Sequence, residues 1–497
     1  TCGSHWLTFS SVSGTSTTKV TFACTGATTG DATIDSPLPI NVNWHVERTS
    51  GTFTNAIVKL EGGEIDLTNT VAQSTAQAGN YTKVNSTPAA GSVTSTVGIG
   101  AIGTDTWLGI GSSKIKTYYS YQPGRWSRPS FTWTLDPSGT TQVGSSIPSN
   151  DDNVVILPGR TVTLTADTVV TGLNVTIEAG GVLDLSTYKF TSGLASLDGQ
   201  GTLKIAASYF PTVATNNFIN TGGGTTEYNG ASFNLPAQAT YNNLTINKTL
   251  ASDIATQTID LTLNGNLQVK NGTFQINDNT ARRLKLTVNG DVTVNSGASL
   301  TVGTGGTNST TTPTGITGST SPAPFIDYYD LQSHRVVLNG NFTNNGTVRF
   351  TNLTYPVYDK FPPTSGATSG FATVYFQGAS DNNLLCAGPT DFYNLVLDKG
   401  TDQTFKLTLY TSGSYHYFRL FGANISDGDG GTANPNLKKA LWIRTGTLEV
   451  QGTTVIPSLT EGTTAAGSPN SDFVIPANGA LVVNGIDVII QTTADDY

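Results

Sequence analysis

A few clusters of acidic and basic residues could do chemistry in this chain. Glu61, Glu64 and Asp66 could pair for the acid and base steps of glycoside hydrolysis, but they sit in a Gly-Gly turn, where a solvated corner is the better interpretation. The basic segment from Arg282 to Lys285 could supply the base of a polysaccharide lyase. Lys285 alternates with the leucines on either side and therefore points outward, as on a solvated face. We predict no catalytic residues and a protein that is not an enzyme.

The best candidate metal site is the pair Asp427 and Asp429 in the segment NISDGDGGTANPN. Carboxylate oxygens in a flexible loop are suitable Ca²⁺ ligands, although the spacing and the terminal Glu of an EF-hand are absent. A plain long corner is the alternative interpretation. The four histidines are scattered and none has a partner at i, i+4, which argues against zinc. We expect no cofactor, with bound Ca²⁺ as the open alternative.

Clustered aromatic residues indicate where a sugar could bind, because an aromatic face suits the apolar C–H face of a saccharide. One group, around Tyr118, Trp126 and Trp133, is better explained as packing inside a cap. A second group lies in expected long loops, where exposure and burial are about equally favoured. The predicted glycan contacts in this second group are Tyr328, Tyr329, Tyr355 and Tyr358.

The composition favours strands and corners and argues against several classes of function. The chain has 497 residues, of which 55 are Gly and only 12% are charged. Thr and Val favour strands, Gly and Asn favour turns, and helical periodicity is nearly absent. The net charge of −9 and the pI near 4.9 argue against nucleic acid as a partner. The sequence has no apolar run of membrane-spanning length, so we expect no membrane span.

Three cysteines are present, and two of them lie near the start of the chain. Cys2 and Cys24 flank a hairpin-like segment, HWLTFSS followed by TKVTFAC, and we predict a disulfide that links neighbouring strands. Two unpaired thiols are the alternative. Cys386 is left alone and is expected to be a small buried hydrophobic residue. The chain lacks Met altogether, including at position 1, so we expect a processed product or a piece of a longer protein.

A recurring phrase of short apolar strands and Asn-Gly or Gly-Gly corners dominates the second two-thirds of the chain. It includes LTLNGN, LTVNGD and VVLNGN, whose glycines are Gly265, Gly290 and Gly340. The first two are 25 residues apart, about one turn of a three-sided solenoid. The next 50 residues are interpreted as two such turns, partly filled by an extruded loop. Stacked coils cover one another's faces, so that inward Val, Leu and Ile form ladders and corner Asn residues hydrogen-bond from coil to coil.

A longer repeat indicates duplication of a multi-coil unit. TTEYNGASFNLPAQATYNNLTIN, from Thr225, resembles ATVYFQGASDNNLLCAGPTDFYNLVLD, from Ala372. Both contain a strand, an NGAS or QGAS turn, and an aromatic residue followed by Asn-Leu and an apolar strand. The leucines of the two Asn-Leu pairs, Leu244 and Leu395, are 151 residues apart.

These patterns predict an all-β protein with three parts. INVNWHVE, from Ile40, alternates apolar and polar residues and predicts a half-buried antiparallel strand in a region with the turn spacing of a sandwich. The next region is rich in Tyr, Trp and Pro and would cap the end of a solenoid. The three parts are a β-sandwich-like domain at 1–117, a junction or cap at 118–150 and a parallel β-helix at 151–497, with extruded loops at about 305–333 and 351–370. A row of small sandwiches is the alternative for the last part.

The junction and the first coil contain a spaced pattern of Trp, Pro, Asp-Asn and alternating apolar residues. This pattern comprises Trp126, Pro129, Trp133, Pro148, Asp152, Asn153, Val154, Ile156, Gly159, Val162 and Leu164. Together with the NLTIN-type coils after it, it resembles the large type IX-secreted cell-surface adhesins of gliding Bacteroidetes over about residues 118–497. The resemblance implies a right-handed parallel β-helix outside the cell, with the secretion and gliding machinery and a substratum or polysaccharide as partners. It also implies O-glycosylation of Thr168, within Asp-Thr-Val.

Three functions fit these observations. The first, which we favour, is a non-enzymatic secreted adhesin or filament segment that serves surface attachment or gliding motility through many weak contacts. The second is a secreted carbohydrate-active β-helix enzyme, a polysaccharide lyase or hydrolase, which would need an acidic cleft with bound Ca²⁺. The third is an inert segment of a larger secreted chain that only its transporter recognises.

Overall fold

The computed structural model of this protein describes residues 5–23, 29–30, 34, 38, 40–66, 69–100, 106–112, 114–276, 284–303, 334–351, 372–414, 417–420, 441–456 and 475–490. Over these residues the protein is nearly all β, with one four-residue helix. The chain divides into two compact units. The first contains Thr1–Val182, Phe190–Leu197 and Thr212–Thr215, and the second contains Leu183–Lys189, Asp198–Pro211 and Asn216–Tyr497.

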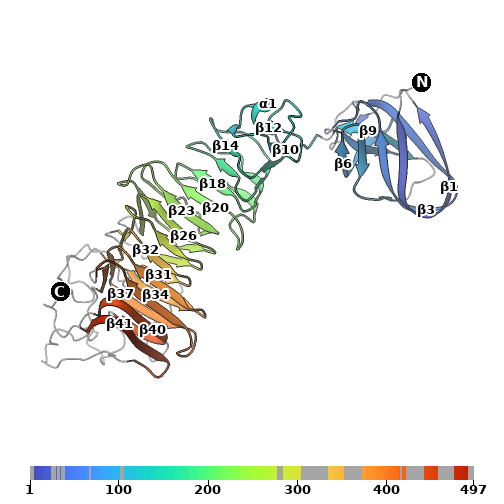
Figure 1. Cartoon of the computed structure of the whole chain (residues 1–497). Coiled ribbons are helices and arrows are strands. Elements are labelled where there is room, and N and C mark those ends of the chain that lie inside the picture. The colour runs from blue at the N-terminus through green and yellow to red at the C-terminus, as the bar shows by residue number, and fades with distance from the viewer. Residues whose placement is uncertain are drawn as a thin grey trace, which may run out of the picture. The chain divides into compact units, whose positions relative to one another are not determined.

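The first unit begins with an antiparallel, sandwich-like domain built around one long strand, β3 (Ile40–Glu61). β1 (Trp6–Ala23) pairs along one edge of β3, and β9 (Thr106–Ser112) pairs with the first part of its other edge (Figure 1). The sheet order is β2-β5-β4-β9-β3-β7-β6, with β1 and β8 also paired to β3. The remaining strands are β2 (Thr29–Gly30), β4 (Asn69–Ser74), β5 (Asn80–Val84), β6 (Ser86–Ala89), β7 (Ser92–Ser95) and β8 (Ile99–Gly100).

The inward apolar side predicted for β3 is confirmed, but Asn43, which the alternation places on the opposite side, is also buried, at 1% exposed. Ile40, Val42, Trp44 and Val46 are at most 8% exposed and belong to one core. The second half of the same strand contributes Val58 and its apolar neighbours to that core. The two halves of β3 therefore face a shared interior, as expected for a sandwich.

The aromatic junction packs into the interior of the first unit. Pro129 starts the short helix, where its missing N–H would have no helical partner anyway. The Trp133 indole N–H donates to the Trp126 carbonyl at 2.8 Å, and the two rings meet edge to face with centroids 4.9 Å apart. Tyr118, Trp126 and Trp133 are all buried, so these three rings are core rather than a sugar-binding surface. Tyr119 and Tyr121 in the same segment are half-buried. The elements of the junction are β10 (Thr117–Ser120), β11 (Gly124–Arg125), α1 (Pro129–Thr132) and β12 (Trp133–Thr134).

Parallel pairing begins directly after the sandwich. β10 pairs in parallel with β13, and the order β12-β10-β13-β15-β17-β19 forms a six-stranded sheet. Val154 stacks on Val175 and Ile156 on Ile177, and all four are fully buried. The strands after the junction are β13 (Asn153–Ile156), β14 (Thr161–Thr163), β15 (Asn174–Ile177), β16 (Val182–Asp184), β17 (Leu194–Asp198) and β19 (Val213–Asn216).

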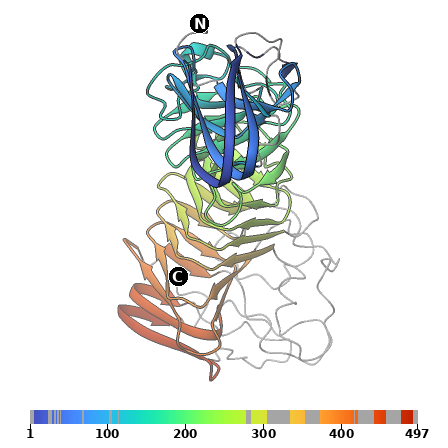
Figure 2. The same cartoon turned by 90° about the vertical axis from the view of Figure 1, so that its right-hand side faces the viewer.

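The second unit is a stack of parallel coils with three faces (Figures 1 and 2). Face 1 contains β18 (Thr202–Ile205), β20 (Thr225–Tyr228), β23 (Asn243–Asn247), β26 (Leu267–Asn271), β29 (Val292–Val294), β32 (Phe342–Asn344), β35 (Asn382–Cys386), β38 (Lys406–Thr411), the second part of β40 (Leu441–Ile456) and β41 (Gly479–Ile490). Face 2 contains β22 (Thr240–Tyr241), β25 (Leu261–Leu263), β28 (Lys285–Val288), β31 (His334–Leu338), β34 (Ala372–Gly378), β37 (Asn394–Lys399) and the first part of β40.

Faces 1 and 2 make up most of a 19-stranded parallel sheet, and face 3 is a seven-stranded one. Face 3 contains β21 (Phe233–Asn234), β24 (Ile254–Gln257), β27 (Thr273–Ile276), β30 (Ser299–Val302), β33 (Thr347–Arg349), β36 (Thr390–Phe392) and β39 (Phe418–Leu420).

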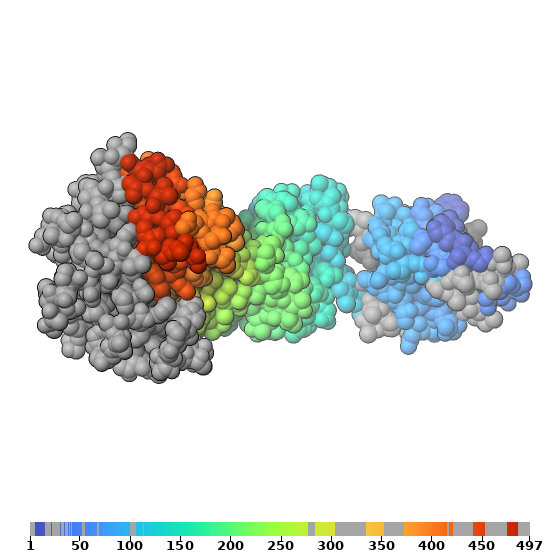
Figure 3. Space-filling view, turned by 90° about the horizontal axis from the view of Figure 1, so that it is seen from below, coloured from blue at the N-terminus to red at the C-terminus, as the bar shows by residue number. Residues whose placement is uncertain are grey.

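Continuous apolar ladders hold the coils together. Leu267, Val292, Phe342 and Leu384 are register partners in successive coils, and each is at most 1% exposed. Because one coil cannot cover the inner side of its own strands, each coil depends on its neighbours for burial. The orange and red residues of the later coils accordingly form one continuous surface (Figure 3). The parallel β-helix predicted for this part of the chain is confirmed.

The expected coil period is correct at first and then needs a correction. Leu261 pairs with Leu286, a step of 25 residues. Leu286 then pairs directly with Val336, so those 50 residues form one coil rather than two. The long step is possible because register fixes only the strands, and a corner tolerates an insertion. The extruded loops expected at 305–333 and 351–370 lie outside the described residues, apart from Thr351.

Candidate functional site

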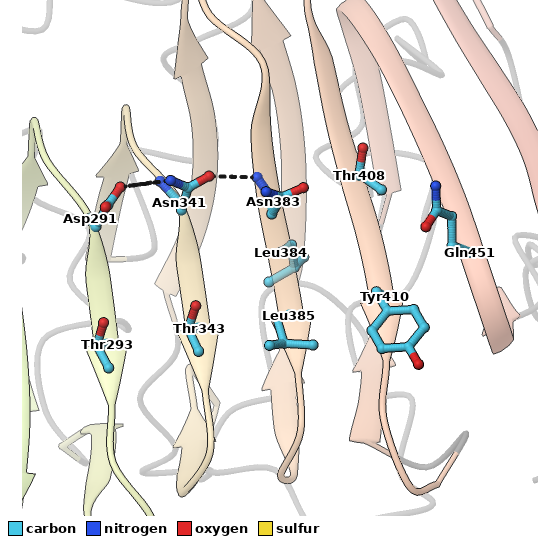
Figure 4. Close-up of a pocket in the computed structure, with 10 residues that line it drawn as sticks. All are labelled: Asp291, Thr293, Asn341, Thr343, Asn383, Leu384, Leu385, Thr408, Tyr410 and Gln451. Atoms are coloured by element: carbon cyan, nitrogen blue, oxygen red, sulfur yellow. Dashed lines mark hydrogen bonds between the residues drawn. The ribbon is translucent and has the colours of Figure 1, made fainter.

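A ladder of Asn and Asp side chains runs along one corner of the second unit. The backbone N–H of Asn266 donates to Asn243 Oδ1, and that of Asp291 donates to Asn266 Oδ1, both at 2.8 Å. Asn341 N–H donates to Asp291 Oδ1 at 2.8 Å, and Asn383 N–H donates to Asn341 Oδ1 at 2.9 Å (Figure 4). Each coil therefore satisfies a corner N–H of the next, as the corner asparagines predicted.

A glycine precedes three of the ladder residues, Asn266, Asp291 and Asn341, because neighbouring coils approach closely there. A Cβ on Gly290 would overlap both Asn266 Oδ1 and the Gly265 carbonyl group. A Cβ on Gly340 would overlap the Gly290 carbonyl group in the same way. The Asn-Gly-Asn and Asn-Gly-Asp corners are thus selected by lack of space, not by a left-handed backbone.

Face 1 carries an open hollow of about 430 Å³ beside this ladder, which we call the face 1 groove. Its floor includes a row of outward side chains in register on successive strands (Figure 4). Parallel strands lie about 4.8 Å apart, so the row presents one side chain at each such step. The groove is lined by Asp291, Thr293, Asn341, Thr343, Asn383, Leu384, Leu385, Thr408, Tyr410 and Gln451.

The groove is rich in hydroxyl and amide groups and nearly free of charge. Asp291 is its single charged lining residue, and Asp291 Oδ1 already accepts two hydrogen bonds from Asn341. Lys406 and Glu449 lie just beyond and form an ion pair at 2.9 Å. Hydrogen bonds from Asn484 and then Lys406 lower the pKa of Glu449 to about 2, so it stays ionised and paired. Such a surface suits an uncharged, hydroxyl-rich ligand.

Tyr410 is the aromatic residue of the groove and is 44% exposed. Its register partners are Leu385 on one side and Gln451 on the other, so an apolar patch adjoins an amide. The sequence-based predictions missed Tyr410. The alternation in LTLYT puts it on the same outward side as Thr408, which was the available signal.

Asp391 is a buried carboxylate that two arginines neutralise. Arg419 donates to it through Nε at 2.7 Å and Nη2 at 2.9 Å, and Arg349 Nε lies 3.2 Å from it. The three residues are register partners on face 3. This ion ladder compensates a charge that is only 1% exposed.

Two buried lysines occupy equivalent positions in the repeated segment. Lys248 Nζ donates to the Asn229 carbonyl at 3.3 Å, and Lys399 Nζ donates to the Gln377 carbonyl at 3.0 Å. Both side chains are at most 2% exposed, and burial lowers the pKa of each to about 8. They are 151 residues apart, like the repeated leucines.

The two copies of this repeat start on different faces of the coil. β20 pairs with β23 on face 1, whereas β34 pairs with β37 on face 2. Each copy spans one complete coil, so the same local contacts recur one face further round. The repeated sequence therefore corresponds to one complete coil and is not tied to a particular face of the solenoid.

Most of the residues predicted as sites lie outside the described part of the chain. Thr168 is described: it is half-buried, and its hydroxyl donates to the Ala166 carbonyl at 3.3 Å. Cys386 is buried as expected, and burial raises the pKa of its thiol to about 12, which makes it unreactive. The remaining predicted site residues lie outside the described part of the chain, so their roles stay predictions: Cys2, Cys24, Tyr328, Tyr329, Tyr355, Tyr358, Asp427 and Asp429.

The described residues contain no group of three His, Cys, Asp or Glu side chains arranged to hold a metal ion. Within the same ranges, no helix has the length and apolar character needed to cross a membrane.

Comparison of the chain with protein-family models, with curated proteins and with solved structures gives no match. The class of the protein is therefore defined by its own fold and surface. It is a parallel β-helix that follows a sandwich-like domain and carries an open, nearly uncharged groove on face 1.

Proposed function

We propose that this chain is a non-enzymatic segment of a secreted cell-surface adhesin, and that its face 1 groove binds polysaccharide. The observation that carries the proposal is the row of Thr, Leu, Tyr and Gln side chains in register across the groove, beside the amide ladder. Hydroxyl and amide groups hydrogen-bond to sugar hydroxyls, and Tyr410 offers a ring for the apolar face of a sugar.

The chemistry of the groove favours binding over cleavage. Glycoside hydrolysis needs two carboxyl groups that flank the scissile bond. The groove lining contains one, Asp291, and that group is engaged in the ladder. The fixed amide and hydroxyl groups of the groove suit a ligand that is bound rather than a substrate that is cleaved.

Repetition supports a role in attachment. Each coil offers a few weak contacts, and several contacts on one ligand chain bind with a higher combined affinity than any of them alone. Export by the type IX system and a part in gliding motility rest on the resemblance carried by the junction, including Trp126 and Trp133. In that setting the secretion and gliding machinery are the partners that move the protein.

The binding proposal is tested with a panel of soluble neutral and acidic polysaccharides in affinity electrophoresis. We expect retardation by a neutral polysaccharide and a loss of at least tenfold in affinity for Tyr410→Ala. Tyr188→Ala is the matched control, because Tyr188 is a half-exposed tyrosine that does not line the groove. Equal binding by the two variants, or no retardation by any polysaccharide, would contradict the proposal.

The enzymatic alternative is tested on the same panel. Release of new reducing ends or unsaturated sugar ends by the purified chain would show a hydrolase or a lyase. We expect neither product, with or without added Ca²⁺. The export proposal is tested separately: in a type IX-deficient host, the protein should stay inside the outer membrane.

A further inference from the structure

The two copies of the repeated segment differ beside their buried lysine. In the first copy, Lys248 Nζ lies 3.3 Å from the centroid of the Phe233 ring, an arrangement that stabilises an ammonium ion. Alignment of GASFN with GASDN puts Asp381 where the first copy has Phe233. The second copy therefore replaces an aromatic ring with a carboxylate next to the position of Lys399.

Lys399 also has a partner that Lys248 lacks. Its Nζ donates to Asn382 Oδ1 at 2.5 Å, and the two residues are 0% and 7% exposed. A carbonyl carbon lies about 1.2 Å from its oxygen, so Asn382 Cγ is within about 4 Å of the amine. The second hydrogen bond, to the Gln377 carbonyl at 3.0 Å, restricts the amine to this position.

The local chemistry makes the amine available as a nucleophile. Burial lowers the pKa of Lys399 to about 8, and the charge of Asp381 acts in the opposite direction. At pH 7, about a tenth of such an amine is unprotonated. Asp381 is itself fixed, because its Oδ1 accepts the Lys406 backbone N–H at 2.8 Å.

We propose that Lys399 and Asn382 form an intramolecular isopeptide bond. The unprotonated Nζ attacks Asn382 Cγ, a new N–C bond forms, and the Cγ–Nδ2 bond breaks. One proton moves from Nζ to the leaving nitrogen, which departs as ammonia, while the nearby negative charge of Asp381 stabilises the positive charge that develops on Nζ. The step involves no oxidation or reduction and needs no co-reactant.

Such a bond would close one coil of the β-helix into a covalent ring. Residues 382–399 contain β35, β36 and β37, one strand on each face. A coil closed in this way cannot unwind when the chain is pulled, because its ends are covalently joined. This inference does not depend on what the face 1 groove binds.

The proposal is tested on the full chain by mass spectrometry. We expect the intact mass to be lower than the sequence mass by one ammonia, and a protease digest to contain a branched peptide that joins Lys399 to Asn382. Lys399→Arg and Asn382→Ala should both abolish the mass deficit and the branched peptide. Lys248→Arg is the matched control and should leave both unchanged.

A succinimide at an Asn-Gly corner would also remove one ammonia, and the variants separate the two cases. A deficit that persists in Lys399→Arg would overturn the proposal, as would a digest of the wild-type chain with Lys399 and Asn382 only in linear peptides. Asp381→Ala should slow the formation of the branched peptide at least tenfold. Wild-type speed in that variant would refute the role given to Asp381.

Discussion

Two asparagines, one directly before strand β32 and one at its end, provide a sharp test of how the coils are held together. Asn341 precedes β32 and is partly exposed, whereas Asn344 ends β32 and is fully buried. Asn344 Nδ2 donates to the Pro389 carbonyl at 2.8 Å and to Thr390 Oγ1 at 2.9 Å, and its Oδ1 accepts the Gly346 N–H at 2.9 Å. Both residues therefore link neighbouring coils, but with different access to water.

The expected costs follow from what each truncation leaves behind. In Asn344→Ala the Pro389 carbonyl keeps its bond from Val348 N–H at 2.9 Å, but the buried Gly346 N–H loses its partner. An orphaned buried donor costs about 1–3 kcal/mol, and the other lost bonds add about 1 kcal/mol, so we expect a loss of about 3 kcal/mol. In Asn341→Ala, the exposed Asn383 N–H loses its acceptor, and water takes that place. We therefore expect a loss of stability of about 0.5–1 kcal/mol.

The assay is urea unfolding followed by circular dichroism, combined with hydrogen exchange of the peptide that contains Gly346. Asn344→Ala should lower the unfolding midpoint clearly more than Asn341→Ala and should speed exchange at Gly346. Equal losses in the two variants would refute the reasoning, because burial of the orphaned N–H would then not decide the cost. Unchanged exchange at Gly346 in Asn344→Ala would refute it as well.

Three further predictions concern the second unit. Because the lowered pKa of Lys248 means that the unfolded chain binds more protons between about pH 8 and 10, stability should rise with pH over that range, and a fall in the urea midpoint would contradict this. Phe342→Ala should cost about 3–5 kcal/mol in urea unfolding, because the ring is fully buried in the apolar ladder; a loss below about 1 kcal/mol would be incompatible with that packing. Gly290→Ala should lower stability by about 1–3 kcal/mol, because the added Cβ overlaps the previous coil. Gly63→Ala is the control and should be nearly neutral, because an added Cβ there meets nothing within 4 Å. Thermal melting of the two variants tests the difference.

Much of the fold could be predicted because the relevant signals are local. The alternation at Ile40, the strand-and-corner phrases and the first 25-residue step each depend on residues close in sequence. The 50-residue step between Leu286 and Val336 was misread as two coils. The spacing between two motifs includes every residue between them, whereas the hydrogen-bond register depends only on the residues that pair.

The candidate site was much less predictable than the fold. Tyr410, Leu385 and Thr343 lie far apart in sequence and become neighbours only when three successive coils align in register. The contact of Lys399 with Asn382 also requires the end of β37 to lie beside the start of β35, on a different face of the coil. The sequence repeat marked the neighbourhood of Lys399 but gave no sign of the partner.

The sequence by itself determined that this chain forms short strands with apolar inner sides, glycine-tight corners and asparagines able to bridge coils. These outcomes depend on residue types and short-range periodicity, which the linear order of residues contains in full. Only the tertiary structure decided which residues share a surface, how many residues one coil consumes and where a buried amine meets an amide. Those outcomes depend on the register between coils, and the energy that fixes register comes from burial across the whole stack.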